Sequence, residues 1–273
     1  MSFAAVMVHV DAQAPCEARV RLAATLARKF DAVLIGLGAL AIPPTRVAEG
    51  ESVEEVAEAD ARTAVATLAE RGHWFRGIVA GEVRAHEWRP VFDFANPALA
   101  REARSADIVV IGRAPDGTDP RSALDPAAAV LTLGRPALVV PERVSSLRAE
   151  RIVIGWKDAR EARRAVIEAL PLLQTAGQVS IAEITGSGDS RAALDRMEDV
   201  ARHLQRHRVN VGARIFQEPK GPIGAQMVRI AEDERADLIV VGAYGHSRLG
   251  EWVFGGMTQE LLAKCPLCCL MSH

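Results

Sequence analysis

The chain has 273 residues, of which 49% are hydrophobic and 25% charged, with a formal net charge of −2. This balance is typical of a globular protein and gives no reason to expect a nucleic-acid surface or a polybasic membrane patch. No apolar run approaches the roughly 20 residues that cross a bilayer, the first residues lack the basic segment of a signal peptide, and four cysteines do not make a disulfide framework at this length. We therefore expect a cytoplasmic protein with reduced cysteines, built from one large or two ordinary domains.

Apolar runs alternate with helical patterns through the first half of the chain. The runs predict strands at residues 4–10, 32–39, 84–89, 108–111 and 137–140. Helical patterns cover residues 16–30, 51–79 and 126–133, and the 51–79 pattern has acidic residues in its first turns, as the helix dipole favours. Asn96 followed by Pro97 predicts an N-cap and the first residue of a further helix.

The second half repeats this alternation. Strands are predicted at residues 151–156, 179–184, 211–216, 238–241 and 267–271, and helices at 222–232 and 257–263. Two apolar stripes at helical spacing predict the buried faces of two more helices. The first stripe is Ala162, Ala165, Val166, Ala169, Leu170 and Leu173, and the second is Leu194, Met197, Ala201 and Leu204. Near-continuous apolar strands between helices favour a parallel sheet covered on both faces.

The two halves also match each other in sequence, which predicts a duplicated domain. Residues 105–112 match 235–242 and residues 135–141 match 265–271, both at an offset of 130, whereas residues 5–11 match 151–157 at an offset of 146. The first half is therefore about 16 residues longer in its middle, and we assign the additional residues to the 51–79 helix. The predicted domains are residues 1–143 and 151–273, joined by a polar linker at 144–150.

The predicted fold class is α/β, with two tandem doubly wound, Rossmann-like parallel sheets of five strands in a flavodoxin-type order. If the strand order reverses between the first and fourth strands, a ligand crevice lies at their carboxyl ends. In the second half this places the residues after Trp156 beside those after Val241.

A glycine-rich stretch follows the apolar run 238–241 and precedes a predicted helix. Glycine lets backbone N–H groups approach an anion, and a helix N-terminus adds unpaired donors, so the stretch could cradle phosphate. Ordinary turn chemistry is the alternative. The spacing is more specific, because Gly242 and Gly245 are three apart and Gly255 follows after nine intervening residues.

This spacing resembles the nucleotide loop of the ATP-binding universal stress proteins, and with the duplicated sheet pattern the whole chain resembles a tandem universal stress protein. The family usually has Ser or Thr after the last glycine, whereas this chain has Gly256, with Thr258 two residues further on. The resemblance implies a stress-response regulatory protein that binds ATP or AMP, with or without Mg²⁺, in its second domain, and at most slow ATP hydrolysis.

The resemblance also implies which residues form the site: the base would lie between strand ends, and the phosphates over Gly245 and residues 255–257. The implied cofactor-binding residues are Trp156, Lys157, Ile184, Val241, Gly242, Gly245, His246, Gly255, Gly256 and Met257. Each of three residues has an alternative interpretation. Trp156 could serve core packing, Lys157 could be an ordinary solvated surface residue, and His246 could belong to a solvated loop tip.

The first half keeps Asp11 where the family has an aspartate at the end of the first strand, but it lacks the glycine loop. After Gly112 there is no Gly-x-x-Gly pair, and Pro115 and Pro120 remove backbone donors that a phosphate cradle would use. We therefore expect the first domain to have lost nucleotide binding and to serve a structural or regulatory role.

Other candidate motifs favour structural roles. His203 and His207 have the i, i+4 spacing of a metal pair, but no third ligand is in view, so a solvated helix face is favoured over a metal site. Cys265, Cys268 and Cys269 enter a predicted strand instead of a helix N-terminus, which favours buried inert thiols. No nucleophile–base arrangement, carboxylate pair or Walker motif appears, so we predict no catalytic residues.

Two other functions stay open: a nucleotide-free protein-interaction or regulatory module of the same fold, and an enzyme of the related adenine-nucleotide hydrolase group. Family domains pair through their fifth strands, which implies that residues 137–140 pair with 267–271 in an intrachain pseudo-dimer that protects both sheet edges. The sequence leaves open whether the chain forms a further homodimer.

Overall fold

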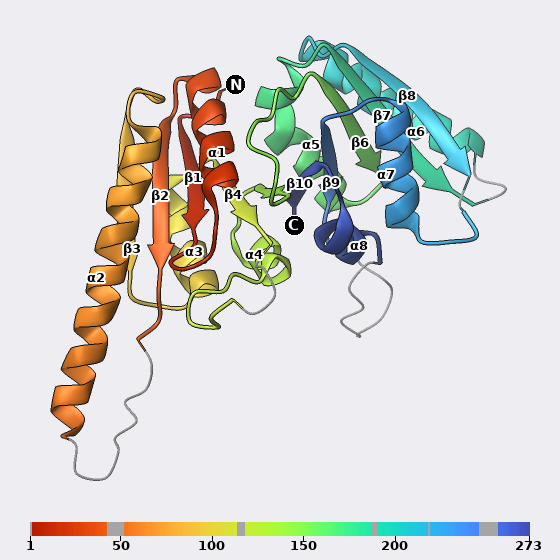
Figure 1. Cartoon of the computed structure of the whole chain (residues 1–273). Helices are drawn as coiled ribbons and strands as arrows, with labels where there is room; N and C mark the ends of the chain where they lie inside the picture. Colours follow the sequence, from red (N-terminus) through yellow and green to blue (C-terminus); the bar gives the residue numbers. More distant parts are fainter. Residues whose placement is uncertain (1, 43–51, 114–117, 187–189, 218, 246–255) are drawn as a thin grey trace.

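The computed structural model describes residues 2–42, 52–113, 118–186, 190–217, 219–245 and 256–273. Within these ranges ten strands form one sheet in the order β3-β2-β1-β4-β5-β10-β9-β6-β7-β8 (Figure 1). Every neighbouring pair is parallel except β5 and β10. The predicted α/β class with parallel pairing inside each half is therefore confirmed.

The first half supplies strands β1 to β5 and helices α1 to α4. Their bounds are β1 (Ala5–Val10), α1 (Glu17–Phe30), β2 (Val33–Ala39), α2 (Val53–Val79), β3 (His86–Val91), α3 (Ala95–Glu102), the 3₁₀ turn η1 (Ala103–Ser105), β4 (Ile108–Gly112), α4 (Pro126–Thr132) and β5 (Ala137–Val140). Residues 144–150, between the halves, contain no helix or strand.

The second half supplies strands β6 to β10 and helices α5 to α8. Their bounds are β6 (Arg151–Trp156), α5 (Arg160–Leu173), β7 (Gln178–Thr185), α6 (Ser190–Arg206), β8 (Val211–Gln217), α7 (Ile223–Asp233), β9 (Leu238–Gly242), α8 (Gly256–Lys264) and β10 (Cys268–Ser272).

The sheet topology corrects one detail of the prediction, the strand order within each half, and confirms another, the pairing of residues 137–140 with 267–271. Within each half the sequence order is 3-2-1-4-5, which is the Rossmann arrangement; the flavodoxin order is 2-1-3-4-5. The third strand adds to the free edge of the second and does not return to pair with the first, although the reversal between the first and fourth strands is as predicted. The two predicted sheets are also continuous, because β5 pairs antiparallel with β10 and each satisfies the other's edge.

Helices cover both faces of the sheet, and alternate strand residues fill two cores. One core packs under α1, α2, α5 and α6, and the other under α3, α4, α7 and α8. Val6 and Val8 of β1 belong to the first core and Met7 to the second. The stripe predicted on α5 is buried throughout, which confirms that helix and the face it presents to the sheet.

Helix α2 is 27 residues long, against 17 for α6, its counterpart in the second half, so it accounts for most of the additional length of the first half. Its buried residues, Ala64, Leu68, Gly72, Phe75 and Val79, all lie in the part from Ala64 to the C-terminus. In Figure 1 the other part of α2 extends beyond the end of the sheet.

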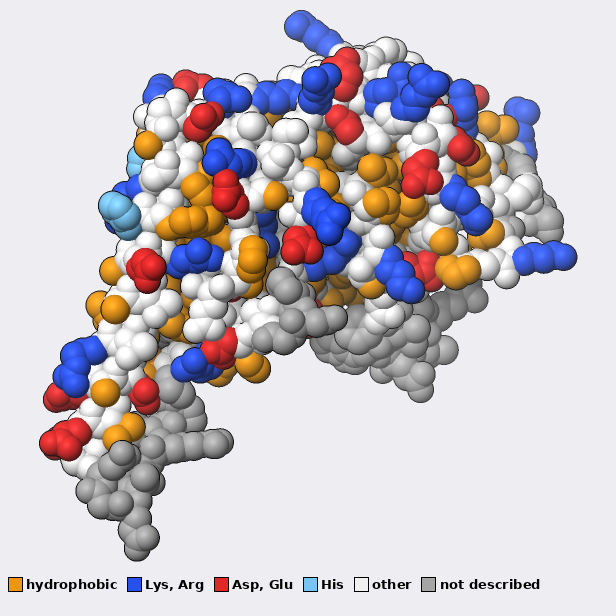
Figure 2. All heavy atoms as spheres, in the orientation of Figure 1, with side chains coloured by type: hydrophobic (Ala, Val, Ile, Leu, Met, Phe, Trp, Pro, Cys, Tyr) orange, Lys and Arg blue, Asp and Glu red, His pale blue; other side chains and the backbone are white. Residues whose placement is uncertain are grey.

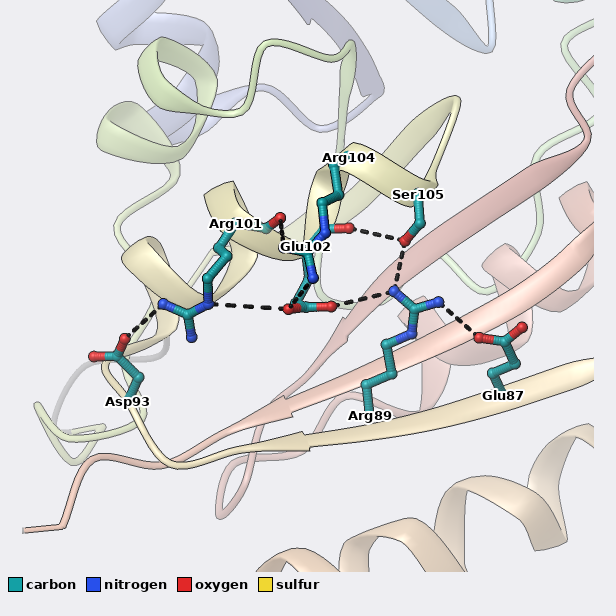
Figure 3. A network of polar contacts seen from close by, with 7 residues as sticks. All are labelled: Glu87, Arg89, Asp93, Arg101, Glu102, Arg104 and Ser105. Carbon is teal, nitrogen blue, oxygen red and sulfur yellow. Dashed lines mark hydrogen bonds and ion pairs between the residues drawn. The ribbon is translucent and has the colours of Figure 1, made fainter.

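A polar network fastens the edge strand β3 to α3 (Figure 3). Glu102, whose side chain is 14% exposed, pairs with Arg89 of β3 and with Arg104, both at 3.2 Å. Arg89 also pairs with Glu87 at 2.8 Å and donates to Ser105 Oγ. Charged side chains on an edge strand discourage pairing with another chain. Figure 2 shows basic and acidic side chains interspersed over one face of the molecule, in keeping with the small net charge.

Two local predictions were wrong because tertiary contacts outweighed the local signal. Asn96 is not an N-cap, because α3 begins at Ala95, two residues earlier than predicted, and its N-cap is Phe94. The Asn96 side chain instead exchanges two hydrogen bonds with the backbone of Asp125, at 2.8 and 2.9 Å. Leu194 of α6 is 40% exposed, and its neighbour Ala193 is buried in its place.

None of the helices in the described ranges is long and apolar enough to cross a membrane.

Candidate functional site

A cavity of about 770 Å³ lies at the carboxyl ends of β6, β7 and β9, where the strand order of the second half reverses. Its lining includes seven of the residues predicted from the sequence: Trp156, Lys157, Ile184, Gly242, Gly245, Gly256 and Met257. Val241 does not line it, because its side chain is buried in the core beneath the sheet. His246 and Gly255 lie outside the described residues.

The wall formed by the strand ends carries two buried polar side chains. Trp156, the last residue of β6, is the register partner of Glu183 on β7, and each is 7% exposed. Within the described part of the chain, the indole Nε1 of Trp156 and the Oε2 of Glu183 have no hydrogen-bond partner. Trp156 also packs into the first core, so the packing role and the cavity-lining role foreseen for it are both present.

Gly242 has a packing role in addition to its place in the cavity wall. A Cβ atom there would lie 2.4 Å from the backbone nitrogen of Ala162 and 2.5 Å from the carbonyl carbon of Glu161. Only glycine therefore lets the first turn of α5 approach the end of β9 so closely. Gly245 is less constrained, since its closest contact would be Glu161 Oε2 at 3.3 Å, and a Cβ at Gly256 would meet nothing within 4 Å.

The first turn of α8 closes the cavity opposite the strand ends. Gly256, Met257 and Thr258 all belong to this turn and line the cavity. Backbone N–H groups of a first helical turn have no partner within the helix, so they form a natural anion site. Thr258 is buried, and its Oγ1 accepts a hydrogen bond from the backbone N–H of Tyr244 at 3.4 Å. This hydroxyl fastens the residues after β9 to α8.

Charges around the cavity are largely compensated. Three carboxylates line it, and each has an arginine partner: Asp158 with Arg163 at 2.5 Å, Glu161 with Arg160 at 2.5 Å, and Glu183 with Arg196 at 2.8 Å. Lys157 is exposed at the rim and adds a positive charge. With the partial charge of the α8 N-terminus, the field at this end of the cavity favours an anion.

Sequence reasoning missed Glu161, Glu183 and Arg196 as cavity residues. A signal for Glu183 exists, because it is a charged residue near the carboxyl end of an otherwise largely apolar strand, next to the predicted Ile184. Its partner Arg196 lies on the following helix, and only the packing of α6 on β7 brings the two together.

The C-terminus of α8 is held by a side chain of the first half. Arg113, directly after β4, donates from Nη2 to the carbonyl oxygens of Leu261 at 3.0 Å and Cys265 at 2.7 Å, and from Nε to that of Leu262. A cation that satisfies the last carbonyls of a helix also complements its dipole. The residue of the second half that corresponds to Arg113, at the offset of 130, is Ala243. Helix α4, the counterpart of α8 in the first half, therefore receives no equivalent arginine from the second half.

In the first half, two arginine side chains lie at the equivalent strand ends. A Cβ at Gly112 would lie 1.9 Å from Nη1 of Arg19, so this guanidinium takes the space that the glycine leaves. Arg19 Nε donates to the carbonyl oxygen of His9 at 2.9 Å, and Arg71 Nε donates to that of Asp11 at 2.8 Å. Burial, and secondarily the charge of Arg19, lowers the pKa of His9 to about 3, so its ring is neutral.

The remaining candidate motifs have structural surroundings. Cys265, Cys268 and Cys269 are buried free thiols; burial raises the pKa of Cys268 to about 12, whereas a hydrogen bond with Cys269 lowers that of Cys265 to about 7. The rings of His203 and His207 lie edge to face, with centroids 4.8 Å apart. In the ranges that the structure describes, no three His, Cys, Asp or Glu side chains are grouped to hold a metal ion.

Comparisons with known proteins agree with this architecture. Residues 151–273, the half with the cavity, match the model of the Universal stress protein family. We found no curated protein whose sequence matches that of the chain. Among solved structures, a universal stress protein from Archaeoglobus fulgidus DSM 4304 is similar with a TM-score of 0.70 at 14% identity, covering 98% of this chain and 95% of that one.

Two structures from Pseudomonas aeruginosa are also similar over almost their whole length. A putative universal stress protein from strain UCBPP-PA14 has a TM-score of 0.59 at 14% identity, covering 99% of this chain and 93% of that one. A functionally unknown protein from strain PAO1 has a TM-score of 0.57 at 13% identity, with coverages of 99% and 92%. At these identities the likeness concerns the fold, which these proteins share across both halves of the chain.

Proposed function

We propose that the second half of the chain binds an adenine nucleotide, ATP or AMP, in the 770 Å³ cavity, and that the protein is a regulator in a stress response. One observation carries the proposal: the reversal of strand order creates a cavity that joins the ends of β6 and β7 to the first turn of α8. The family match of residues 151–273 supports it. In this proposal residues 1–143 and 151–273 are two universal-stress-type domains, and residues 144–150 link them.

The size and charge of the cavity suit a nucleotide. Its volume lies within the roughly 300–1,000 Å³ of small-molecule sites. The base would lie against Trp156 and Ile184, and the phosphates would lie near Gly245 and the α8 N-terminus, within reach of Lys157. Since each lining carboxylate has an arginine partner, the cavity can accept phosphate charge, and Mg²⁺ bound to ATP would reduce that charge further.

The first half would bind no nucleotide in this proposal. The guanidinium of Arg19 lies against Gly112. In the second half the corresponding glycine is Gly242, which lies against the first turn of α5 in the wall of the cavity. A nucleotide would have to displace this side chain together with its hydrogen bond to the His9 carbonyl. We therefore expect one nucleotide per chain.

The test is calorimetric titration of ATP and AMP, with and without Mg²⁺, into the purified protein and into Gly245→Val. A valine at position 245 would place its methyl groups near the Glu161 carboxylate and in the phosphate region. The matched control is Gly212→Val, because Gly212 lies exposed on β8, away from the cavity, and a Cβ there meets nothing within 4 Å.

Binding of one nucleotide per chain, lost in Gly245→Val and kept in Gly212→Val, is the expected result. Absence of binding at millimolar nucleotide would contradict the proposal and favour the nucleotide-free interaction module. Rapid ATP turnover that survives Gly245→Val would favour the hydrolase alternative and would count against the assigned cavity.

A further inference from the structure

We propose that Arg113 of the first half controls how tightly the second half binds the phosphates of the nucleotide, by holding α8 where its first turn borders the cavity. This role rests on the proposed function, because it concerns the phosphate end of the same cavity. Arg113 is then a positioning residue that acts through α8. It gives the first half a part in binding, although that half would bind no nucleotide itself.

The first turn of α8 is the part of the cavity wall that a movement of the helix would change. Gly256, Met257 and Thr258 lie in this turn and line the cavity, and the N–H groups of a first helical turn have no partner inside the helix. Helix α8 has nine residues, so it is about 13 Å long. Because so short a helix moves as one unit, a shift of its C-terminus also moves the amides that would meet the phosphates.

Arg113 holds that C-terminus from the first half. It follows β4 directly, and β4 pairs with β1 on one side and with β5 on the other, so the backbone of Arg113 is anchored at the centre of the first half. Its Nη2 donates to the carbonyl oxygens of Leu261 at 3.0 Å and Cys265 at 2.7 Å, and its Nε donates to that of Leu262. Three bonds from one planar cation fix both the position and the direction of the helix end.

The second half by itself holds α8 less firmly. Among the described residues, two side-chain hydrogen bonds join α8 to the rest of that half: Tyr244 N–H to Thr258 Oγ1 at 3.4 Å, and Ala225 N–H to Glu260 Oε2 at 3.2 Å. The first bond is long and the second is exposed to solvent, so both are weaker than the bonds from the guanidinium. The apolar side chains of α8 pack into the second core, but apolar contacts are not directional.

Removal of the guanidinium would therefore lower the share of molecules in which α8 is correctly placed for binding. The apparent dissociation constant rises in inverse proportion to that share. If α8 is in place in roughly one molecule in ten without Arg113, ATP binds about tenfold more weakly. Adenosine has no phosphate, so its affinity should not depend on the first turn of α8.

The experiment is calorimetric titration of ATP, and of adenosine in competition with ATP, into the full-length protein and its variants Arg113→Met and Arg113→Lys. Methionine has similar length but no donor, whereas lysine keeps the charge without the planar fork. We expect Arg113→Met to weaken ATP about tenfold and adenosine less than about twofold, and Arg113→Lys to weaken ATP about threefold. If adenosine is too weak to compete, tripolyphosphate replaces it, and Arg113→Met should weaken tripolyphosphate by the same factor as ATP.

A matched control removes the same kind of contact from another helix of the second half. Arg151 Nε donates to the carbonyl oxygen of Glu234, the residue that follows α7, at 2.7 Å. Arg151 is the first residue of β6, at the opposite end of that strand from the cavity. Arg151→Met should therefore keep the affinity for ATP within about twofold of the wild-type value. Equal losses of ATP affinity in Arg151→Met and Arg113→Met would show a general effect of stability and would overturn the role of Arg113.

The remaining outcomes separate this role from the proposed function. Wild-type affinity for ATP in Arg113→Met, or equal losses for ATP and adenosine, would overturn the role of Arg113 and leave nucleotide binding intact. If Arg113→Met does not fold, as judged by its thermal transition, Arg113→Lys decides by the same comparison. Failure of the wild-type protein to bind ATP would overturn the proposed function itself.

Discussion

Arg113→Met should destabilise the second half of the chain although the residue belongs to the first. The guanidinium donates to three carbonyl oxygens at the C-terminus of α8, and methionine has similar length but no donor. A hydrogen bond to a charged group contributes about 1.5–3 kcal/mol, and a cation at a helix C-terminus about 0.3–2 kcal/mol. Since the three bonds share one charge and water can reach part of the site, we expect a total loss of about 2–4 kcal/mol.

Two measurements test this prediction. Urea unfolding should show a lower midpoint for Arg113→Met with an unchanged slope, and hydrogen exchange should become faster at the amides of α8 before those of β1 to β4. Arg135→Met is the control, because Arg135 is exposed and, among the residues that the structure describes, makes a single hydrogen bond, at 3.5 Å, to the Arg104 carbonyl. A loss below about 0.5 kcal/mol in Arg113→Met, or equal losses in the two variants, would refute the claim that Arg113 holds α8.

Three further predictions concern single positions. Gly242→Ala should cost about 2–3 kcal/mol in urea unfolding, because its Cβ meets the backbone of Ala162, whereas Gly256→Ala should change stability by less than about 0.5 kcal/mol; equal effects would contradict the packing role. The pKa of His9 is about 3 in the folded state and 6.5 in the unfolded state, so the unfolded chain binds more protons between these two pH values. The free energy of unfolding should therefore fall as the pH drops from 6.5 to 3, by up to about 1.4 kcal/mol per pH unit. The same pH dependence in His9→Leu would argue against this assignment. The side chain of Asp125, the N-cap of α4, accepts a hydrogen bond from the backbone N–H of Ala127 at 2.9 Å. Asp125→Ala should therefore lower the free energy of unfolding by about 1 kcal/mol, and Asp125→Asn by clearly less. Identical losses in the two variants would show that the cap contributes nothing.

Much of the fold could be predicted because its signals are local. Buried parallel strands such as β4 and β9 are uninterrupted apolar runs, and the matching offsets show which strands of the two halves correspond. The order of the strands in the sheet depends on contacts between them and was predicted wrongly. The pairing of β5 with β10 followed from the resemblance to a family whose domains pair by their fifth strands, and the structure confirms it. The third strand was predicted two residues too early, since β3 is an edge strand with mixed polar and apolar residues.

The contacts that define the site depend on which segments meet in space. Nothing near Arg113 in the sequence indicates that it reaches α8, about 150 residues later. In the same way Arg19 enters the crevice beside Gly112 only because α1 packs against β4. The glycine pattern singled out Gly242 and Gly245, which line the cavity, yet it gave no sign of the close contact between Gly242 and α5.

These contacts make the two halves unequal despite their common strand order. In the first half arginine side chains lie at the strand reversal, whereas in the second half the corresponding strand ends border a cavity. Arg113 reaches from the first half to α8, the helix that borders this cavity. We therefore propose that the second half binds the ligand and that the first half supports α8.

A crystal structure of the full-length protein grown with ATP and Mg²⁺ is the direct test of nucleotide binding in the second half. We predict one nucleotide per chain, with its base beside Trp156 and Ile184 and its phosphates at the first turn of α8. Nucleotide bound in the crevice between Arg19 and Gly112, or found only outside the cavity of the second half, would contradict it.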